Sequence, residues 1–193
     1  MSKPKKWVQT ILPMHPESHW SVESGCLAFV ADHGAIRFDY PETWVVMPGE
    51  GGAIDFYDKE PPDGNSVLTV SYITLPPFAV PGFTLAMCME EAARVDPRPI
   101  YEFGPMHEIR RGSMAIVWRQ ARYIDETEKR DAVSRTCIAR KGRIQALLTF
   151  EYWADAAECS ERAWDIILKT LRLGELVIDV TRGPWRGKHR GRG

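Results

Sequence analysis

Residues 143–153, with the sequence RIQALLTFEYW, carry the strongest strand signal of the chain. Every second residue is apolar, a period of two that places one face of a β-strand against a core: Ile144, Ala146, Leu148, Phe150 and Tyr152. Two further long strands are expected before it, over 114–124 and 132–140. Lys141-Gly142 is short enough for a two-residue hairpin, because Gly accepts positive φ angles. This part of the chain therefore predicts an antiparallel meander.

Shorter strands are expected ahead of the meander, over residues 26–30, 36–40, 44–47, 53–57 and 67–74. In the second of these, apolar residues alternate with Arg37 and Asp39, which predicts that these two side chains face solvent. The Gly-rich stretch 49–52 resembles a phosphate loop in composition. A strand follows it, however, whereas a phosphate cradle requires a helix N-terminus, so we interpret it as a hairpin turn.

Two helices are expected. The first begins after Thr84 as N-cap and stops at Asp96-Pro97. The second runs from Asp155, as N-cap with Glu158 in a capping box, to about Leu171. The residues predicted for its buried stripe are Cys159, Ala163, Ile167 and Leu171, with Trp164 and Leu168 beside them. The ion pairs predicted on its outer face are Glu158–Arg162 and Asp165–Lys169.

These elements predict an α+β fold in which helices pack on an antiparallel β-sheet, an α/β/α sandwich. Residues 1–25 are rich in Pro, His, Ser and Glu and are expected to form an irregular N-terminal arm. Residues 26–173 are expected to form a single α/β domain. Residues 174–193 are expected to be a basic Arg/Gly-rich C-terminal tail.

The stretch 36–44, IRFDYPETW, resembles the opening Tyr-Pro-x-x-Trp hairpin of the Mog1/PsbP-like superfamily. The helix that contains Trp164 and leads to Lys169-Thr170-Leu171-Arg172-Leu173 resembles the last helix of that superfamily. The resemblance covers roughly residues 27–173, and its motifs are structural. It implies a Mog1/PsbP-like α/β/α sandwich and a binding or assembly role, because known members are mostly non-catalytic. It implies no binding residue in this chain.

The formal net charge of −1 conceals an uneven distribution. Residues 182–193 contain five Lys or Arg and no acidic residue. Without those five, 20 basic residues face 26 acidic ones, a formal charge of −6. A dedicated nucleic-acid-binding domain is expected to carry basic residues over a whole face, so an acidic body with a small basic tail is not typical of that class.

The four cysteines, Cys26, Cys88, Cys137 and Cys159, are widely spaced, which is typical of reduced thiols in a cytoplasmic protein. Neither an apolar signal-peptide core nor a membrane span of about 18 apolar residues occurs in the sequence. We therefore expect a cytoplasmic location without membrane association.

No short catalytic motif occurs in the chain, and we expect no metal, no cofactor and no catalytic residue. His15, Glu17 and His19 have metal-ligand spacing only on a helix, which Pro16 opposes. Cys137 and Cys159 are interpreted as buried small hydrophobes rather than nucleophiles. An enzyme or small-ligand carrier with a cleft between sheet and helix stays open, and a cluster of His107, Glu108 and nearby arginines would support it.

Two candidate binding segments emerge from the sequence. In the tail, arginines interleaved with an aromatic residue are typical of weak RNA or anion binding. The favoured alternatives are a disordered, solubilising end, or a tail that folds onto the acidic body of its own chain or of a partner subunit. Its candidate residues are Arg182, Trp185, Arg186, Lys188, Arg190 and Arg192. The other segment is the proline loop 76–83, where Phe78 and Val80 are candidates for an apolar contact patch. The leading hypothesis is a non-catalytic protein-binding or adaptor domain with an unidentified protein partner and unknown oligomeric state.

Overall fold

The structure is a computed structural model, which describes residues 11–13, 15, 20–77 and 83–176. The elements in chain order are β1 (Cys26–Ala31), η1 (Asp32–Gly34), β2 (Ile36–Pro41), β3 (Val45–Pro48), η2 (Glu50–Gly52), β4 (Ile54–Tyr57), β5 (Ser66–Thr74), α1 (Leu85–Val95), β6 (Ile100–Arg111), β7 (Met114–Ile124), β8 (Asp131–Lys141), β9 (Ile144–Trp153), η3 (Ala154–Ala156), α2 (Ala157–Thr170) and β10 (Arg172–Leu173). This is an α+β fold, as the strand and helix patterns predict.

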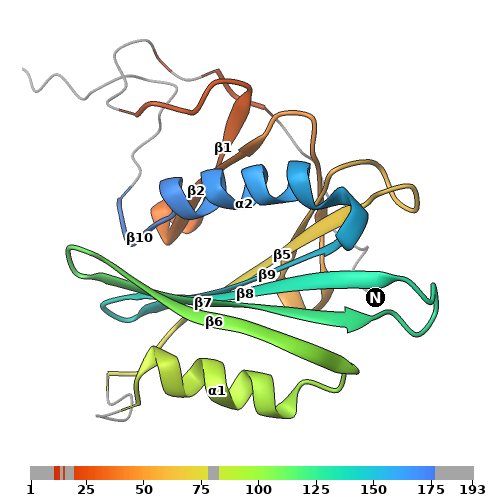
Figure 1. Ribbon diagram of the computed structural model, residues 1–193. Coiled ribbons are helices and arrows are strands. Elements are labelled where there is room, and N and C mark those ends of the chain that lie inside the picture. Colours follow the sequence, from red (N-terminus) through yellow and green to blue (C-terminus); the bar gives the residue numbers. More distant parts are fainter. Residues whose placement is uncertain (1–10, 14, 16–19, 78–82, 177–193) are drawn as a thin grey trace, which may run out of the picture.

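The strands form two antiparallel sheets. The smaller sheet has the order β1-β2-β10, and the larger has the order β3-β4-β5-β9-β8-β7-β6. The predicted meander is confirmed as β7, β8 and β9, which pair in continuous register. In Figure 1, α2 lies on one face of the larger sheet and α1 lies on the opposite face. The two helices therefore cover different faces of the same sheet.

The main core lies between the larger sheet, α2 and β2. Trp164 of α2 is fully buried and stacks on Phe150 of β9, with ring centroids 5.9 Å apart. Phe38 of β2 packs against Phe56 of β4 at 5.3 Å, which joins the smaller sheet to the larger one. A second, smaller cluster lies under α1, where Leu85 and Met89 contact β7 and β8.

The first helix has the predicted boundaries. Thr84 Oγ1 accepts a 3.2 Å hydrogen bond from the Met87 amide, and the helix ends at Val95, directly before Asp96-Pro97. The predicted turn at 49–52 is also confirmed, since the Gly49 amide bonds the Ala53 carbonyl at 2.9 Å between β3 and β4.

The second helix departs from its predicted cap. Its N-cap is Ala156 and makes no side-chain hydrogen bond. The capping-box prediction for Asp155 is wrong because Asp155 lies in η3, where its carboxylate pairs with Arg130 at 2.5 Å. The predicted pair Glu158–Arg162 is confirmed at 2.5 Å, but Lys169 pairs with Glu23 at 2.8 Å instead of with Asp165.

Two predictions of burial are wrong. Cys159 is exposed, and Ser160 takes the buried place beside Ala163 on α2. Asp39 is buried rather than solvent-facing, because β2 is the central strand of the smaller sheet and the carboxylate accepts a 3.0 Å hydrogen bond from the Glu23 amide.

Strand β6 has no counterpart among the predicted elements. It is the edge strand of the larger sheet, and its register with β7 shifts at Gly104-Pro105. Proline is tolerated at an edge strand or bulge because no partner needs its missing N–H. The same residues break the period-two pattern, which hid this strand from sequence analysis.

Candidate functional site

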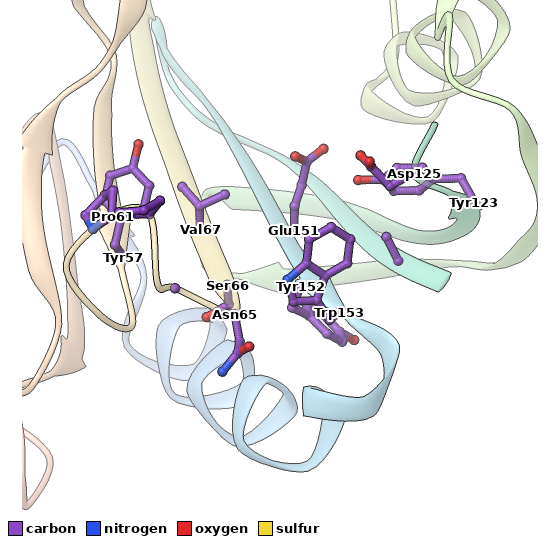
Figure 2. A pocket seen from close by; sticks show the side chains of 13 residues that line it. Tyr57, Pro61, Asn65, Ser66, Val67, Tyr123, Asp125, Glu151, Tyr152 and Trp153 are labelled. Carbon is purple, nitrogen blue, oxygen red and sulfur yellow. The ribbon is translucent and has the colours of Figure 1, made fainter. Parts of the chain in front are cut away.

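A pocket of about 320 Å³ opens at one end of the larger sheet, on the face that carries α1 (Figure 2). It lies where β7 and β9 end and β5 begins. Its walls are aromatic and proline side chains, with two carboxylates among them. The lining residues are Tyr57, Pro61, Pro62, Gly64, Asn65, Ser66, Val67, Tyr123, Asp125, Ala132, Glu151, Tyr152 and Trp153.

Strand pairing explains how residues distant in sequence meet here. Tyr57 pairs with Val67 across β4 and β5, and Val67 pairs with Glu151 across β5 and β9. Paired residues of antiparallel strands point to the same face, so these three side chains form one row. The rim is fixed by the loop before β5, where Asp58 Oδ1 accepts the amides of Asn65 at 2.9 Å and Ser66 at 3.1 Å.

Arg98 lies beside the pocket, where it lines the neighbouring hollow under α1 and pairs with Glu151 of the pocket. Its Nε donates to Asp96 Oδ1 at 2.9 Å, its Nη1 donates to Glu151, and its guanidinium lies 4.8 Å from the centroid of the Tyr123 ring. The hydrogen bond from Arg98 lowers the pKa of Asp96 below its ordinary value. The pKa of Glu151 is nevertheless raised, because burial disfavours its charge more than Arg98 favours it.

Asp125 adds a second carboxylate close to Glu151, and Figure 2 shows both at the same side of the pocket. Oδ1 of Asp125 accepts the amides of Thr127 at 2.9 Å and Glu128 at 2.8 Å, which fixes the turn that follows β7. The negative charges of Asp125 and Asp96 both contribute to the raised pKa of Glu151. The pocket therefore has an excess of negative charge beside aromatic rings, an arrangement that favours organic cations.

The structure describes none of the predicted binding residues. Arg182, Trp185, Arg186, Lys188, Arg190 and Arg192 lie outside the described residues, as do Phe78 and Val80. Phe83, at the end of the same proline loop, is 46% exposed. Sequence analysis missed the pocket because its walls come from separate strands and from the turns beside them, and no local motif links them.

The cluster that would support an enzyme does not form as expected. His107 and Glu108 are neighbours on β6, so their side chains point to opposite faces. His107 stacks on Trp118, with ring centroids 4.1 Å apart, whereas Glu108 lines a hollow at the start of α1 together with Arg110 and Arg140. A narrower hollow of about 190 Å³ lies between α1 and the sheet.

The remaining chemical candidates can be placed individually. Cys137 is fully buried, as predicted, and burial raises its pKa to about 12, which suppresses thiolate formation. His15 is described, but Glu17 and His19 lie outside the described residues. Within the described ranges, no group of three or more His, Cys, Asp or Glu side chains is placed to hold a metal ion. No helix of these ranges has the length and apolarity needed to cross a membrane.

The fold places the chain in the Mog1/PsbP-like class of α+β proteins. It superposes on the solution structure of cyanobacterial PsbP from Synechocystis sp. PCC 6803 with a TM-score of 0.54, at 10% identity, over 78% of this chain and 93% of the other. It also superposes on the Ran-binding protein Mog1p of Saccharomyces cerevisiae with a TM-score of 0.50, at 6% identity, over 77% and 95% of the two chains.

Within this class, the chain belongs to the Alr1449 family, whose model matches residues 27–177. An uncharacterised protein of Nostoc sp., alr1449, is 36% identical over 188 residues, which are 95% of this chain and 97% of the relative. The predicted resemblance to the Mog1/PsbP-like superfamily is thus confirmed at the level of the fold.

Proposed function

We propose that this chain is a non-catalytic binding or assembly protein whose partner is another protein. The observation that carries the proposal is a set of exposed apolar side chains on one face of the larger sheet. Ile73, Leu147 and Met47 lie on the same face as α1, by strand alternation and register, and are 56%, 41% and 40% exposed. We call this surface, with the pocket beside it, the open face.

The open face exists because α1 is too short to cover the sheet. The helix has 11 residues and packs mainly on β7 and β8, which leaves β3, β4 and β5 without a described helix on that side. Large apolar side chains exposed among polar ones, here Asp55, Thr69 and Ser71 by register, are typical of non-obligate protein interaction surfaces. One protein of this fold, Mog1p, is Ran-binding, which supports a protein partner over a small substrate.

The alternative of an enzyme or small-ligand carrier has less support. The hollow at the start of α1 that Glu108, Arg110 and Arg140 line has a ligand-sized volume of about 390 Å³, but His107 does not line it. The hollow between α1 and the sheet, about 190 Å³, is below the roughly 300–1,000 Å³ of typical ligand pockets. RNA or anion binding through the tail is the other alternative, and a nuclease-treated sample separates it from protein binding. A cytoplasmic location remains part of the proposal, and fractionation of source cells tests it.

Capture from a source-cell lysate with full-length protein tests the proposal. The informative variant carries Ile73→Glu and Leu147→Glu, which place charge on the open face at exposed positions. Met87→Glu is the matched control, because Met87 is 45% exposed on α1, away from these strands. We expect a nuclease-resistant protein that the wild type and Met87→Glu retain and the double variant loses. Equal retention by all three chains contradicts the proposal.

A further inference from the structure

We propose that the pocket at the end of β9 binds arginine side chains of the chain's own basic segment, residues 186–192, within the same molecule. This goes beyond the proposed function, since it assigns an intramolecular ligand to the pocket.

The charges around Glu151, in the pocket wall, are unbalanced. Asp96 and Asp125 both raise the pKa of Glu151, and in the described part of the chain the only guanidinium that pairs with Glu151 is that of Arg98, which Asp96 shares. Arg130, over the Trp153 ring of the pocket, is already paired with Asp155, so three carboxylates face the one guanidinium of Arg98. A further cation beside Asp125 and Glu151 relieves their mutual repulsion, which is strongest where burial removes water.

The pocket walls already accept guanidinium groups. Arg98 lies over Tyr123 and Arg130 lies over Trp153, each with a distance of 4.8 Å from the guanidinium carbon to the ring centroid. Guanidinium groups stack on aromatic faces and pair with carboxylates at the same time, which a compact ammonium does less well. Tyr57, on the other side of the pocket in Figure 2, offers a third ring.

The same chain carries a segment of the required chemistry at a suitable distance. The last described residue is Leu176. It lies near the start of β9, since Oε1 of its neighbour Glu175 is 3.9 Å from Nζ of Lys141, the residue that pairs with Ile144. The pocket lies at the other end of β9, whose ten residues span ~33 Å. At ~3.3 Å per extended residue, Arg190 and Arg192 are far enough beyond Leu176 to exceed that length, whereas Arg186 reaches it only when the intervening chain is fully extended.

The test compares the full chain with a full-length variant in which these three arginines are replaced by Gln. The readouts are NMR resonances of the Trp153 indole N–H, assigned with Trp153→Phe, and of the Tyr123 and Asn65 amides. We expect these resonances to move when the arginines are replaced. Titration of the variant with a peptide of residues 182–193 is expected to return these resonances to their positions in the full chain, and the shifts are expected to saturate. A peptide with Gln in place of Arg is expected to leave the resonances unmoved.

A charge-matched pair of substitutions shows whether the pocket itself is responsible. Asp125→Asn is made in the variant that has Gln at positions 186, 190 and 192. It keeps an oxygen acceptor for the turn and is expected to weaken peptide binding roughly five-fold. Glu158→Gln removes the same charge from α2, on the opposite face, and is expected to leave the affinity unchanged. Unmoved pocket resonances, or equal weakening by both substitutions, overturn the proposal. Shifts in the full chain that depend on protein concentration also overturn it, because they place the contact between molecules.

Discussion

The backbone N–H of Asp39 donates a 2.8 Å hydrogen bond to Oγ1 of Thr170, across 131 positions of sequence. Thr170 lies at the end of α2, and its hydroxyl in turn donates to the Ile166 carbonyl at 2.8 Å. The last turn of the helix is thereby tied to β2, the central strand of the smaller sheet. The Thr170 hydroxyl thus connects the end of α2 to β2 of the smaller sheet.

Replacing Thr170 by Val is expected to destabilise the protein by roughly 1–3 kcal/mol, because the shape is kept while the Asp39 amide loses its acceptor. Thr170→Ser keeps the hydroxyl and serves as the control. Urea unfolding measures the free energy of unfolding of both variants. Equal loss in Val and Ser variants contradicts the role of this hydrogen bond.

The thiols are expected to react with an aromatic disulfide reagent in a defined order. Cys159 is exposed on α2 and is expected to react first in the native protein. Cys137 is buried with a pKa of about 12 and is expected to react only on unfolding. Mass spectrometry of the labelled peptides measures the order, and early labelling of Cys137 would argue against its burial in the sheet.

Acid is expected to weaken the contact between Asp96 and Arg98. Because the hydrogen bond from Arg98 lowers the pKa of Asp96 from its ordinary value of 3.8, the pair's contribution is complete above that value and is lost as the pH falls through the lowered pKa. Asp96→Asn is therefore expected to reduce the free energy of unfolding by roughly 1 kcal/mol at pH 7 and by less at pH 3. Urea unfolding at both pH values checks this, and an equal loss at each would contradict it.

Trp164→Phe is expected to reduce the free energy of unfolding far less than Trp164→Ala. Its Nε1 is buried and has no hydrogen-bond partner among the described residues, so its contribution is packing rather than hydrogen bonding. Trp164→Ala is expected to cost ~3–5 kcal/mol through the cavity it leaves. Trp164→Phe keeps the ring against Phe150 and is expected to cost less than half as much in urea unfolding. Equal costs would mean that the indole N–H has a partner.

Local patterns were sufficient for most of the fold. The alternation in β9, the turn at Lys141-Gly142 and the cap at Thr84 each act over a few residues, so they could be predicted from the chain alone. The failures arise where distant residues compete with local rules. The carboxylate of Asp155 pairs with Arg130 and therefore does not cap α2, whose N-cap is Ala156.

What the sequence determined by itself was an α+β chain of antiparallel strands and two helices, with an acidic body and basic residues at 182–193. What only the tertiary structure decided was the position of each element: that the helices lie on opposite faces, that β6 forms the edge, and that Tyr57, Tyr123 and Glu151 meet in one pocket. The physical reason is that residue periodicity specifies which face of an element is apolar, whereas strand order and register specify which faces meet.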